Sequence, residues 1–167
     1  MATEVTMKAL YQRLAPQPQT MEEQEKWGIT GLLHDADYEL SKGHPELHGK
    51  LLFQKEPNRI PEDITYAIKS HNYQNTGIQP QSPLDWSITC CDQLTGLITA
   101  VALIQKDKRL ASVTPESVLK KFNSPSFARG ADREVIKLCE EKLGIPLLDF
   151  IKITLTAMQT IATDLGL

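Results

Sequence analysis

The sequence has few cysteines and lacks a long apolar run. Its three cysteines, Cys90, Cys91 and Cys139, are an odd number without metal-binding spacing, so we expect buried, reduced thiols. The longest apolar run, at about 97–104, is too short to span a bilayer, and no charged-then-apolar signal segment opens the chain. These absences predict a cytoplasmic protein that does not enter a membrane.

The sequence also lacks a basic excess. Its net charge of -3 argues against general binding to double-stranded nucleic acid or to a membrane surface. It contains no Walker loop, no dinucleotide fingerprint, no internal repeat and no low-complexity tract. A length of 167 residues is typical of one domain that can bury a real core, so we expect a single domain over 1–167.

Helical periodicity dominates the chain, whereas the alternation typical of strands is nearly absent. The start signals include a capping box from Thr20 to Glu23, and Ser82 followed by Pro83. Asp132 caps one later helix, and Gly144 is its expected stop. The pattern predicts an all-α protein with helices over 3–14, 46–54, 61–71, 82–104, 133–143 and 146–164, and two more that begin at Thr20 and Thr114.

The most informative segment is 31–39, GLLHDADYE, where an apolar helix meets an imidazole and several carboxylates. Charges beside an apolar segment cost free energy unless they are compensated, and a divalent ion suits His beside Asp. Adjacent helical residues point about 100° apart, so His34 and Asp35 can share one ion only near a helix end. A surface His beside a helix-end Asp is the alternative for this pair taken alone.

Asp92 is a second anomaly, because the pattern places it deep inside the helix that Ser82 begins. Aspartate is a poor residue in a helix interior, and an unpaired carboxylate on a largely buried helix is costly. A hydrogen bond to a nearby Ser, Thr or Lys is the structural alternative to a metal role. Taken together, the two anomalies favour a metal site.

Segments 31–39 and 92–98 (DQLTGLI) resemble the HD-domain superfamily of metal-dependent phosphohydrolases, more narrowly its small stand-alone, HDIG-like bacterial members. The resemblance covers nearly the whole chain, including His48-Gly49, His71-Asn72, 117–121 and 127–130. It implies an all-α HD-domain helical bundle. It also implies that the metal ligands are an early His, the His-Asp pair and a late Asp, of which the last three are His34, Asp35 and Asp92.

The early His has no counterpart here, because the sequence contains no His before His34. Either the chain begins a few residues late or this member lacks one ligand. A water or a neighbouring carboxylate can occupy a vacant position. We therefore expect weak metal occupancy.

His48 and His71 match His positions of the resembling family and are candidates to bind a second ion or a substrate phosphate. The alternative is that they are hydrogen-bonded structural residues. His44 precedes Pro45 in a loop, so we expect it to face solvent.

Asp35, Asp37 and Glu39 are the candidate catalytic carboxylates. Asp37 and Glu39 follow the His-Asp pair closely enough to take a proton from a metal-bound water or give one to the leaving oxygen. Spacing does not separate these two, and a salt bridge to Lys42 is the alternative for Glu39.

Four basic residues are candidates to bind a substrate phosphate: Lys120, Lys121, Arg129 and Arg133. A solvated helix face is the alternative, especially for Lys120, and 106–109 is expected to be solvated surface.

The function that we expect is hydrolysis of a small phosphorylated substrate, with nucleotides suggested only by analogy. The metal lowers the pKa of a bound water, and hydroxide attacks phosphorus. Mixed His and carboxylate ligation fits one or two ions of Mn, Fe, Co, Ni or Zn. Two alternatives stay open, namely a non-catalytic domain that binds a nucleotide or metabolite, and an oxygenase with a pair of irons.

Overall fold

The computed structural model describes residues 1–55 and 59–167, and every regular element in this part of the chain is a helix. The prediction of an all-α protein is therefore confirmed. The helices are, in chain order, α1 (Ala2–Leu14), α2 (Met21–Leu33), the 3-10 helix η1 (Pro45–Leu47), α3 (Leu51–Lys55), α4 (Glu62–His71), α5 (Tyr73–Thr76), α6 (Pro83–Leu103), the 3-10 helix η2 (Leu110–Ser112), α7 (Pro115–Phe122), α8 (Arg133–Leu143), α9 (Leu147–Thr160) and α10 (Ala162–Leu165).

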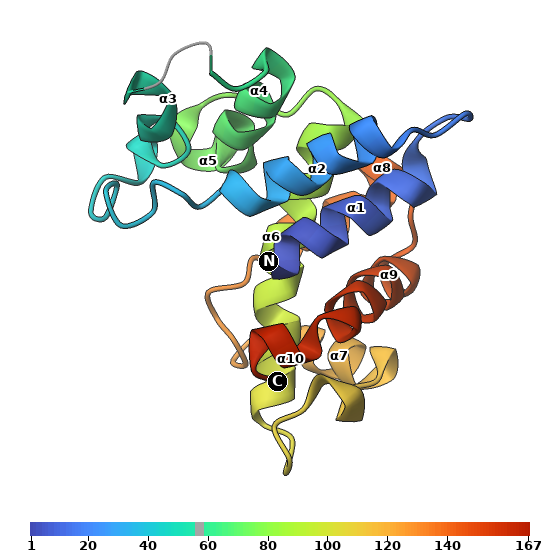
Figure 1. The fold of residues 1–167 in the computed structure, drawn as a ribbon. Coiled ribbons are helices and arrows are strands. Elements are labelled where there is room, and N and C mark those ends of the chain that lie inside the picture. The colour runs from blue at the N-terminus through green and yellow to red at the C-terminus, as the bar shows by residue number, and fades with distance from the viewer. Residues whose placement is uncertain (56–58) are drawn as a thin grey trace.

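The long helix α6 forms the centre of the bundle, and α1, α4, α8 and α9 pack on it (Figure 1). Helices α1 and α2 lie side by side, α3 to α5 gather at one end of the molecule, and α7, α9 and α10 lie toward the other. Residues on α6 such as Ile88, Leu94 and Leu97 are completely buried. Helix α6 is long and apolar enough to cross a membrane, because an 18-residue stretch of it has a mean hydropathy of 1.2. However, 61% of that stretch is buried inside the protein, as in the core helix of a folded domain.

Local signals in the sequence account for the helix ends. The Thr20 hydroxyl accepts a hydrogen bond from the backbone N–H of Glu23, and Ser82 and Asp85 form a reciprocal capping box at the start of α6. Asp132 accepts hydrogen bonds from two backbone N–H groups in the first turn of α8, which ends just before Gly144 as expected. These contacts confirm the predicted starts of α2, α6 and α8.

Two predicted helices are interrupted. The helix predicted over 46–54 is divided into η1 and α3, because the chain turns at Gly49 with a φ of 82°. A Cβ atom at Gly49 would lie 2.7 Å from the carbonyl oxygen of Ile68, so only glycine fits against α4 here. The helix predicted over 146–164 is divided into α9 and α10 at Ile161.

The three cysteines are buried and free, in agreement with the expectation of reduced thiols. Burial raises the pKa of the Cys139 thiol to about 12 and also raises the pKa of Cys90 and Cys91. They pack as small apolar groups in the core around α6.

Candidate metal centre

His34 caps the C-terminal end of α2, where the helix passes very close to α1. A Cβ atom at Gly31 would lie 2.7 Å from the carbonyl oxygen of Thr3, so glycine at this position allows the close approach. The Nδ1–H group of His34 donates to the carbonyl oxygen of Gly31 at 2.8 Å. Its Nε2 atom therefore faces α6, where it lies 3.1 Å from Asp92 Oδ1.

Three histidines in this region share one arrangement of their ring nitrogens. In each, Nδ1 lies at an oxygen that can only accept, so Nδ1 carries a proton and Nε2 faces the other candidate ligands. A histidine that binds metal typically holds its second nitrogen in this way. The acceptors are the Gly31 carbonyl oxygen for His34, Asp37 Oδ1 for His48 and the Ile68 carbonyl oxygen for His71.

Asp35 lies between the imidazoles and faces two of them with different oxygens. Its Oδ2 atom lies 3.3 Å from His34 Nε2, and its Oδ1 atom lies 3.1 Å from His48 Nε2. His48 Nε2 lies in turn 3.2 Å from His71 Nε2. The carboxylate of Asp35 thus connects the end of α2 to His48, which follows η1, and through His48 to His71 on α4.

These residues form two overlapping groups that can hold a metal ion. One consists of His34, Asp35 and Asp92, the other of Asp35, His48 and His71, and within each group the candidate ligand atoms lie within 4.8 Å of one another. All the donors are imidazole nitrogen or carboxylate oxygen, a set that suits first-row divalent ions. The five residues that the sequence identified as candidate ligands are therefore brought together, and Asp35 belongs to both groups.

Strong charge coupling connects His34 with the carboxylates. Burial alone would lower the pKa of His34, but its hydrogen bonds with Asp35 and Asp92 outweigh burial and raise the pKa to about 10. Burial likewise opposes ionisation of Asp35, but hydrogen bonds from His34 and His48 hold its pKa well below the usual range. In the metal-free protein a proton therefore occupies the space where an ion would bind.

The other two histidines differ from each other. The hydrogen bond with Asp35 raises the pKa of His48, and Asp37 adds to this effect. Burial and the positive charge of His34 together lower the pKa of His71 to about 4. His71 is therefore neutral at physiological pH and keeps an Nε2 lone pair that can bind a metal ion.

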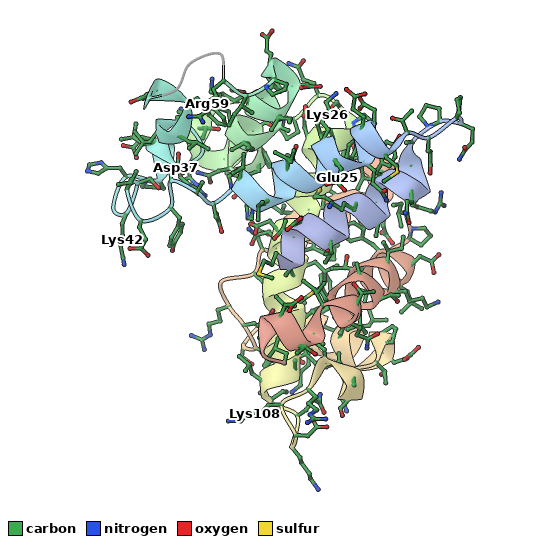
Figure 2. The ribbon with its side chains drawn as sticks, in the orientation of Figure 1. Glu25, Lys26, Asp37, Lys42, Arg59 and Lys108 are labelled. Carbon is green, nitrogen blue, oxygen red and sulfur yellow. The ribbon has the colours of Figure 1, made fainter. Side chains whose placement is uncertain are left out.

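Asp37 lies behind His48 and is fully enclosed. Its side chain has no exposed surface, and it accepts hydrogen bonds from His48 Nδ1 and from the backbone N–H groups of Gly49 and Leu51. Figure 2 shows Asp37 close to α3, whereas Lys42 points outward from the tip of the same segment. This enclosure favours a positioning role for Asp37 over the catalytic role that its spacing suggested.

Glu39 and His44 lie on the exposed side of that segment. Glu39 lies 3.5 Å from Lys42 in an ion pair whose two side chains are 78% and 71% exposed. His44 faces solvent as expected, and its Nδ1 lies 3.4 Å from Glu46. Neither residue belongs to the two metal-binding groups.

The four predicted phosphate-binding residues are not equivalent in the structure. Arg129 lines a cavity of about 510 Å³ together with His71. Lys121 lies over the ring of Phe127 at 4.9 Å, and Lys120 is exposed on α7. Arg133 is directed into the loop that precedes α8, where its guanidinium donates to three backbone carbonyl oxygens, those of Phe127, Ala128 and Ala131.

Gln93 is a residue of this region that the sequence analysis missed. Its Nε2 group donates to Asp92 Oδ2 at 3.1 Å, and its Oε1 atom accepts from the backbone N–H of Asp132 at 3.0 Å. One side chain thus joins a candidate metal ligand to the loop that carries Arg129. The only signal in the sequence was a polar residue next to Asp92 within an apolar helix.

Gln93 also lines two cavities. The cavity of about 510 Å³ contains His71 in its lining, and a second cavity of about 340 Å³ is lined by Asp92, Gln93, Gly130 and neighbouring small residues. Each candidate metal group therefore contributes one residue to the lining of a cavity.

The chain matches no family model, and no curated protein or solved structure was found to match it.

Proposed function

We propose that this protein is a metal-dependent phosphohydrolase that cleaves a small phosphoester at His34, Asp35, His48, His71 and Asp92. The observation that carries the proposal is the shared arrangement of the three histidines, whose Nδ1–H groups are held by oxygen acceptors while their Nε2 atoms face two carboxylates. Structural histidines have no need for this convergence, whereas metal ligands do.

The helical architecture is compatible with an HD-domain bundle, and we assign the chain to that fold as part of the proposal. The resemblance identified the His-Asp pair and a late Asp as ligands, and these residues lie at the end of α2 and in the middle of α6. His48 and His71 complete the set of donors. This agreement between motif and geometry supports the HD assignment.

The donor set fits two ions better than one, because Asp35 directs a different oxygen toward each group. His34, Asp35 and Asp92 would hold one ion, and Asp35, His48 and His71 would hold the other. Mn, Fe, Co, Ni and Zn all suit such ligands. When bound, such ions supply Lewis-acid activation of water and charge neutralisation at the phosphoryl oxygens.

The remaining residues hold the ligands and the substrate. Asp37 fixes the ring of His48, and Gln93 fixes the carboxylate of Asp92. Arg129 lines the same cavity as His71, and its guanidinium suits contacts with two phosphoryl oxygens. These contacts would stabilise the negative charge that develops as the phosphoester is cleaved.

The shared Asp35 also favours one second candidate, a di-iron oxygenase. Three imidazoles and two carboxylates, one of which belongs to both groups, suit a pair of irons as well as a pair of hydrolytic ions. The presence of Arg129 in the adjacent cavity favours the hydrolase, because an anionic group is its natural partner.

Metal analysis combined with a panel of phosphomonoesters and phosphodiesters tests the proposal. We expect phosphate release that depends on added divalent metal, and loss of turnover together with one of the two bound ions in Asp92→Asn. Glu39→Gln is the matched control, because it also removes one carboxylate but on the exposed side of the segment. Oxygen consumption with bound iron and no phosphate release would favour the oxygenase, and an unchanged number of bound ions in Asp92→Asn would contradict the assigned ligands.

A further inference from the structure

The loop 123–132 joins α7 to α8 and runs beside α6 (Figure 1). Its residue Ala128 has a φ of 45°, a left-handed conformation that alanine rarely adopts. Such a conformation persists only where surrounding contacts hold it in place. Arg133 supplies one set of these contacts, because its guanidinium donates to three backbone carbonyl oxygens of the loop. The conformation of the loop therefore depends on the groups that anchor it.

Asp132 is the last residue of the loop, and it forms hydrogen bonds in three directions. Its backbone N–H donates to Gln93 Oε1 at 3.0 Å, and its Oδ2 atom accepts from Gln74 Nε2 at 3.3 Å. Its Oδ1 atom accepts from two backbone N–H groups in the first turn of α8. The end of the loop is thus joined to α6, α5 and α8. The bond to Gln93 is the one that leads to a candidate metal ligand.

The orientation of the Gln93 amide follows from its two partners. The backbone N–H of Asp132 can only donate, so it must face the amide oxygen of Gln93. The NH₂ group then faces Asp92 Oδ2, a carboxylate oxygen that accepts its hydrogen bond at 3.1 Å. Rotating the amide by half a turn would place donor against donor and acceptor against acceptor. Gln93 therefore keeps both hydrogen bonds or loses both.

Asp92 uses its two carboxylate oxygens for different partners. Oδ1 lies 3.1 Å from His34 Nε2, within the candidate metal group, and Oδ2 accepts the hydrogen bond from Gln93. An ion held by this group would fix the carboxylate of Asp92, and with it the acceptor that Gln93 needs. Less conformational entropy is then lost when Gln93 also holds the loop. Metal binding should in this way strengthen the anchor at Asp132.

We propose that Gln93 couples metal binding by His34, Asp35 and Asp92 to the anchoring of the loop 123–132, so that each stabilises the other. The coupling is reciprocal, because a loop that strengthens metal binding must be strengthened by the metal to the same extent. This inference rests on the proposed function for its metal-binding group, but it does not require hydrolysis. It extends that function, because the same ion then fixes the loop that carries Arg129. Gln93 is a positioning residue that acts through Asp92.

Amide hydrogen exchange of the full chain, followed by NMR without metal and with Zn²⁺, tests the coupling. Zn²⁺ is diamagnetic and belongs to the set of ions that suit these ligands. The reporter is the backbone N–H of Asp132, which donates to Gln93. We expect Zn²⁺ to slow its exchange by at least about threefold, the effect of strengthening about one hydrogen bond. The N–H groups of Phe127 and Ala131, which donate within the loop, should follow.

Gln93→Met makes the test specific, because methionine has a side chain of similar length that forms neither hydrogen bond. In the metal-free variant, exchange at Asp132 should be about three- to tenfold faster than in the unaltered protein. Zn²⁺ affinity should fall by about 10- to 100-fold, and saturating Zn²⁺ should no longer slow exchange at Asp132. Gln105→Met is the matched control, because Gln105 is also half-buried but donates to Val101 and lines neither cavity beside the metal-binding groups.

Gln74→Leu identifies the route of the coupling. This substitution removes the hydrogen bond from α5 to Asp132 Oδ2 but leaves the bond between Asp132 and Gln93. Zn²⁺ should therefore still slow exchange at Asp132 in this variant. Loss of the Zn²⁺ effect in Gln74→Leu would place the coupling in α5 and overturn the role of Gln93.

The outcomes separate this inference from the proposed function. If Zn²⁺ binds but exchange at Asp132 stays the same, or if Gln93→Met keeps both Zn²⁺ affinity and the slowed exchange, the inference is wrong and the hydrolase assignment is unaffected. If Zn²⁺ slows exchange through Gln93 but no phosphoester is cleaved with any divalent ion, the coupling stands and the hydrolase assignment fails. Failure to bind Zn²⁺ would also overturn the coupling, and phosphate release with another divalent ion then decides the hydrolase assignment separately.

Discussion

The buried carboxylate of Asp37 holds His48 in place, because Asp37 Oδ1 accepts a hydrogen bond from His48 Nδ1 at 2.9 Å. The same oxygen accepts from the backbone N–H of Gly49, and Asp37 Oδ2 accepts from the N–H of Leu51 at the start of α3. One side chain therefore fixes both the ring of His48 and the turn that carries it. The Nε2 atom of His48 is left facing Asp35 and His71.

Replacing Asp37 by Asn should weaken metal binding without removing a ligand. The Asn side chain has the same size as the Asp side chain. However, its NH₂ group must face at least one N–H group from which the carboxylate of Asp37 accepts a hydrogen bond. We expect metal affinity to fall by about 10- to 100-fold, the usual effect of losing an outer hydrogen bond to a metal-binding histidine. Competition with a fluorescent chelator measures this affinity.

The control for this substitution is Glu39→Gln, which removes one carboxylate from the same segment. Because Glu39 is exposed and forms an ion pair with the exposed Lys42, its loss should leave metal affinity unchanged. Equal metal affinities in the Asp37 variant and the unaltered protein would show that His48 needs no support from Asp37.

The two overlapping groups predict a definite pattern of metal stoichiometry. Because Asp35 belongs to both groups, Asp35→Asn should abolish binding of both ions, whereas His71→Ala and Asp92→Asn should each remove one. Native mass spectrometry of metal-loaded protein counts the ions directly. A single ion in the unaltered protein, lost equally in all three variants, would contradict the two-ion arrangement.

Much of the architecture was predictable from short-range signals. Ser82 with Pro83 and Asp132 gave the starts of α6 and α8 because these residues act on the backbone N–H groups next to them. The division of 46–54 was not predictable, because the turn at Gly49 is imposed by its contact with the carbonyl oxygen of Ile68, on a different helix. Local periodicity carries no information about such a contact.

The same distinction applies to the candidate site. His34 and Asp35 were visible because they follow an apolar helix, and Asp92 because it interrupts one. The roles of Asp37 and Arg133 could not be predicted from the sequence, because the sequence does not show whether a charged side chain is enclosed or exposed. Gln93 joins α6 to a loop 39 residues later, and only the tertiary structure reveals that link.

Metal binding should release protons. In the metal-free protein burial lowers the pKa of His34, but Asp35 and Asp92 outweigh it and raise the pKa to about 10, so His34 is protonated at pH 7.5. A metal ion must displace this proton, and the apparent affinity should rise with pH up to about 10. Calorimetry in two buffers with different ionisation enthalpies measures the proton count, and a count of zero would contradict a protonated His34.

The metal-free protein should also lose stability as pH rises. The folded-state pKa of His34 is raised above its unfolded value of 6.5, so its stabilising contribution is full below about pH 6.5. That contribution decreases as pH rises and is lost once pH passes about 10. Urea unfolding in the presence of a chelator at pH 6, 8 and 10 measures this trend, and His34→Gln should flatten it. A midpoint that rises over this range would contradict the coupling of His34 with Asp35 and Asp92.

Arg129 and Arg133 should respond differently to the same substitution, although they lie four residues apart. Arg133 donates to three backbone carbonyl oxygens of the loop before α8, and those oxygens would lose their partners in Arg133→Ala. We expect Arg133→Ala to lower the free energy of unfolding by about 2 to 3 kcal/mol, the range for charged hydrogen bonds. Arg133→Lys should recover only part of this loss, because an ammonium group lacks the planar fork.

Arg129 lines the cavity beside His71 and lies on the exposed side of the loop, so Arg129→Ala should leave the unfolding free energy within about 0.5 kcal/mol. The KM of the Arg129→Ala variant for a phosphoester should instead rise by about tenfold, because a charge-assisted contact with phosphate is lost. Lys120→Ala is the matched control, since it removes an exposed cation on α7 outside both cavities next to the metal-binding groups. Thermal denaturation and steady-state kinetics on the three Ala variants separate the roles. A normal KM in Arg129→Ala, or unaltered stability in Arg133→Ala, would mean that this loop does not position a phosphate-binding arginine.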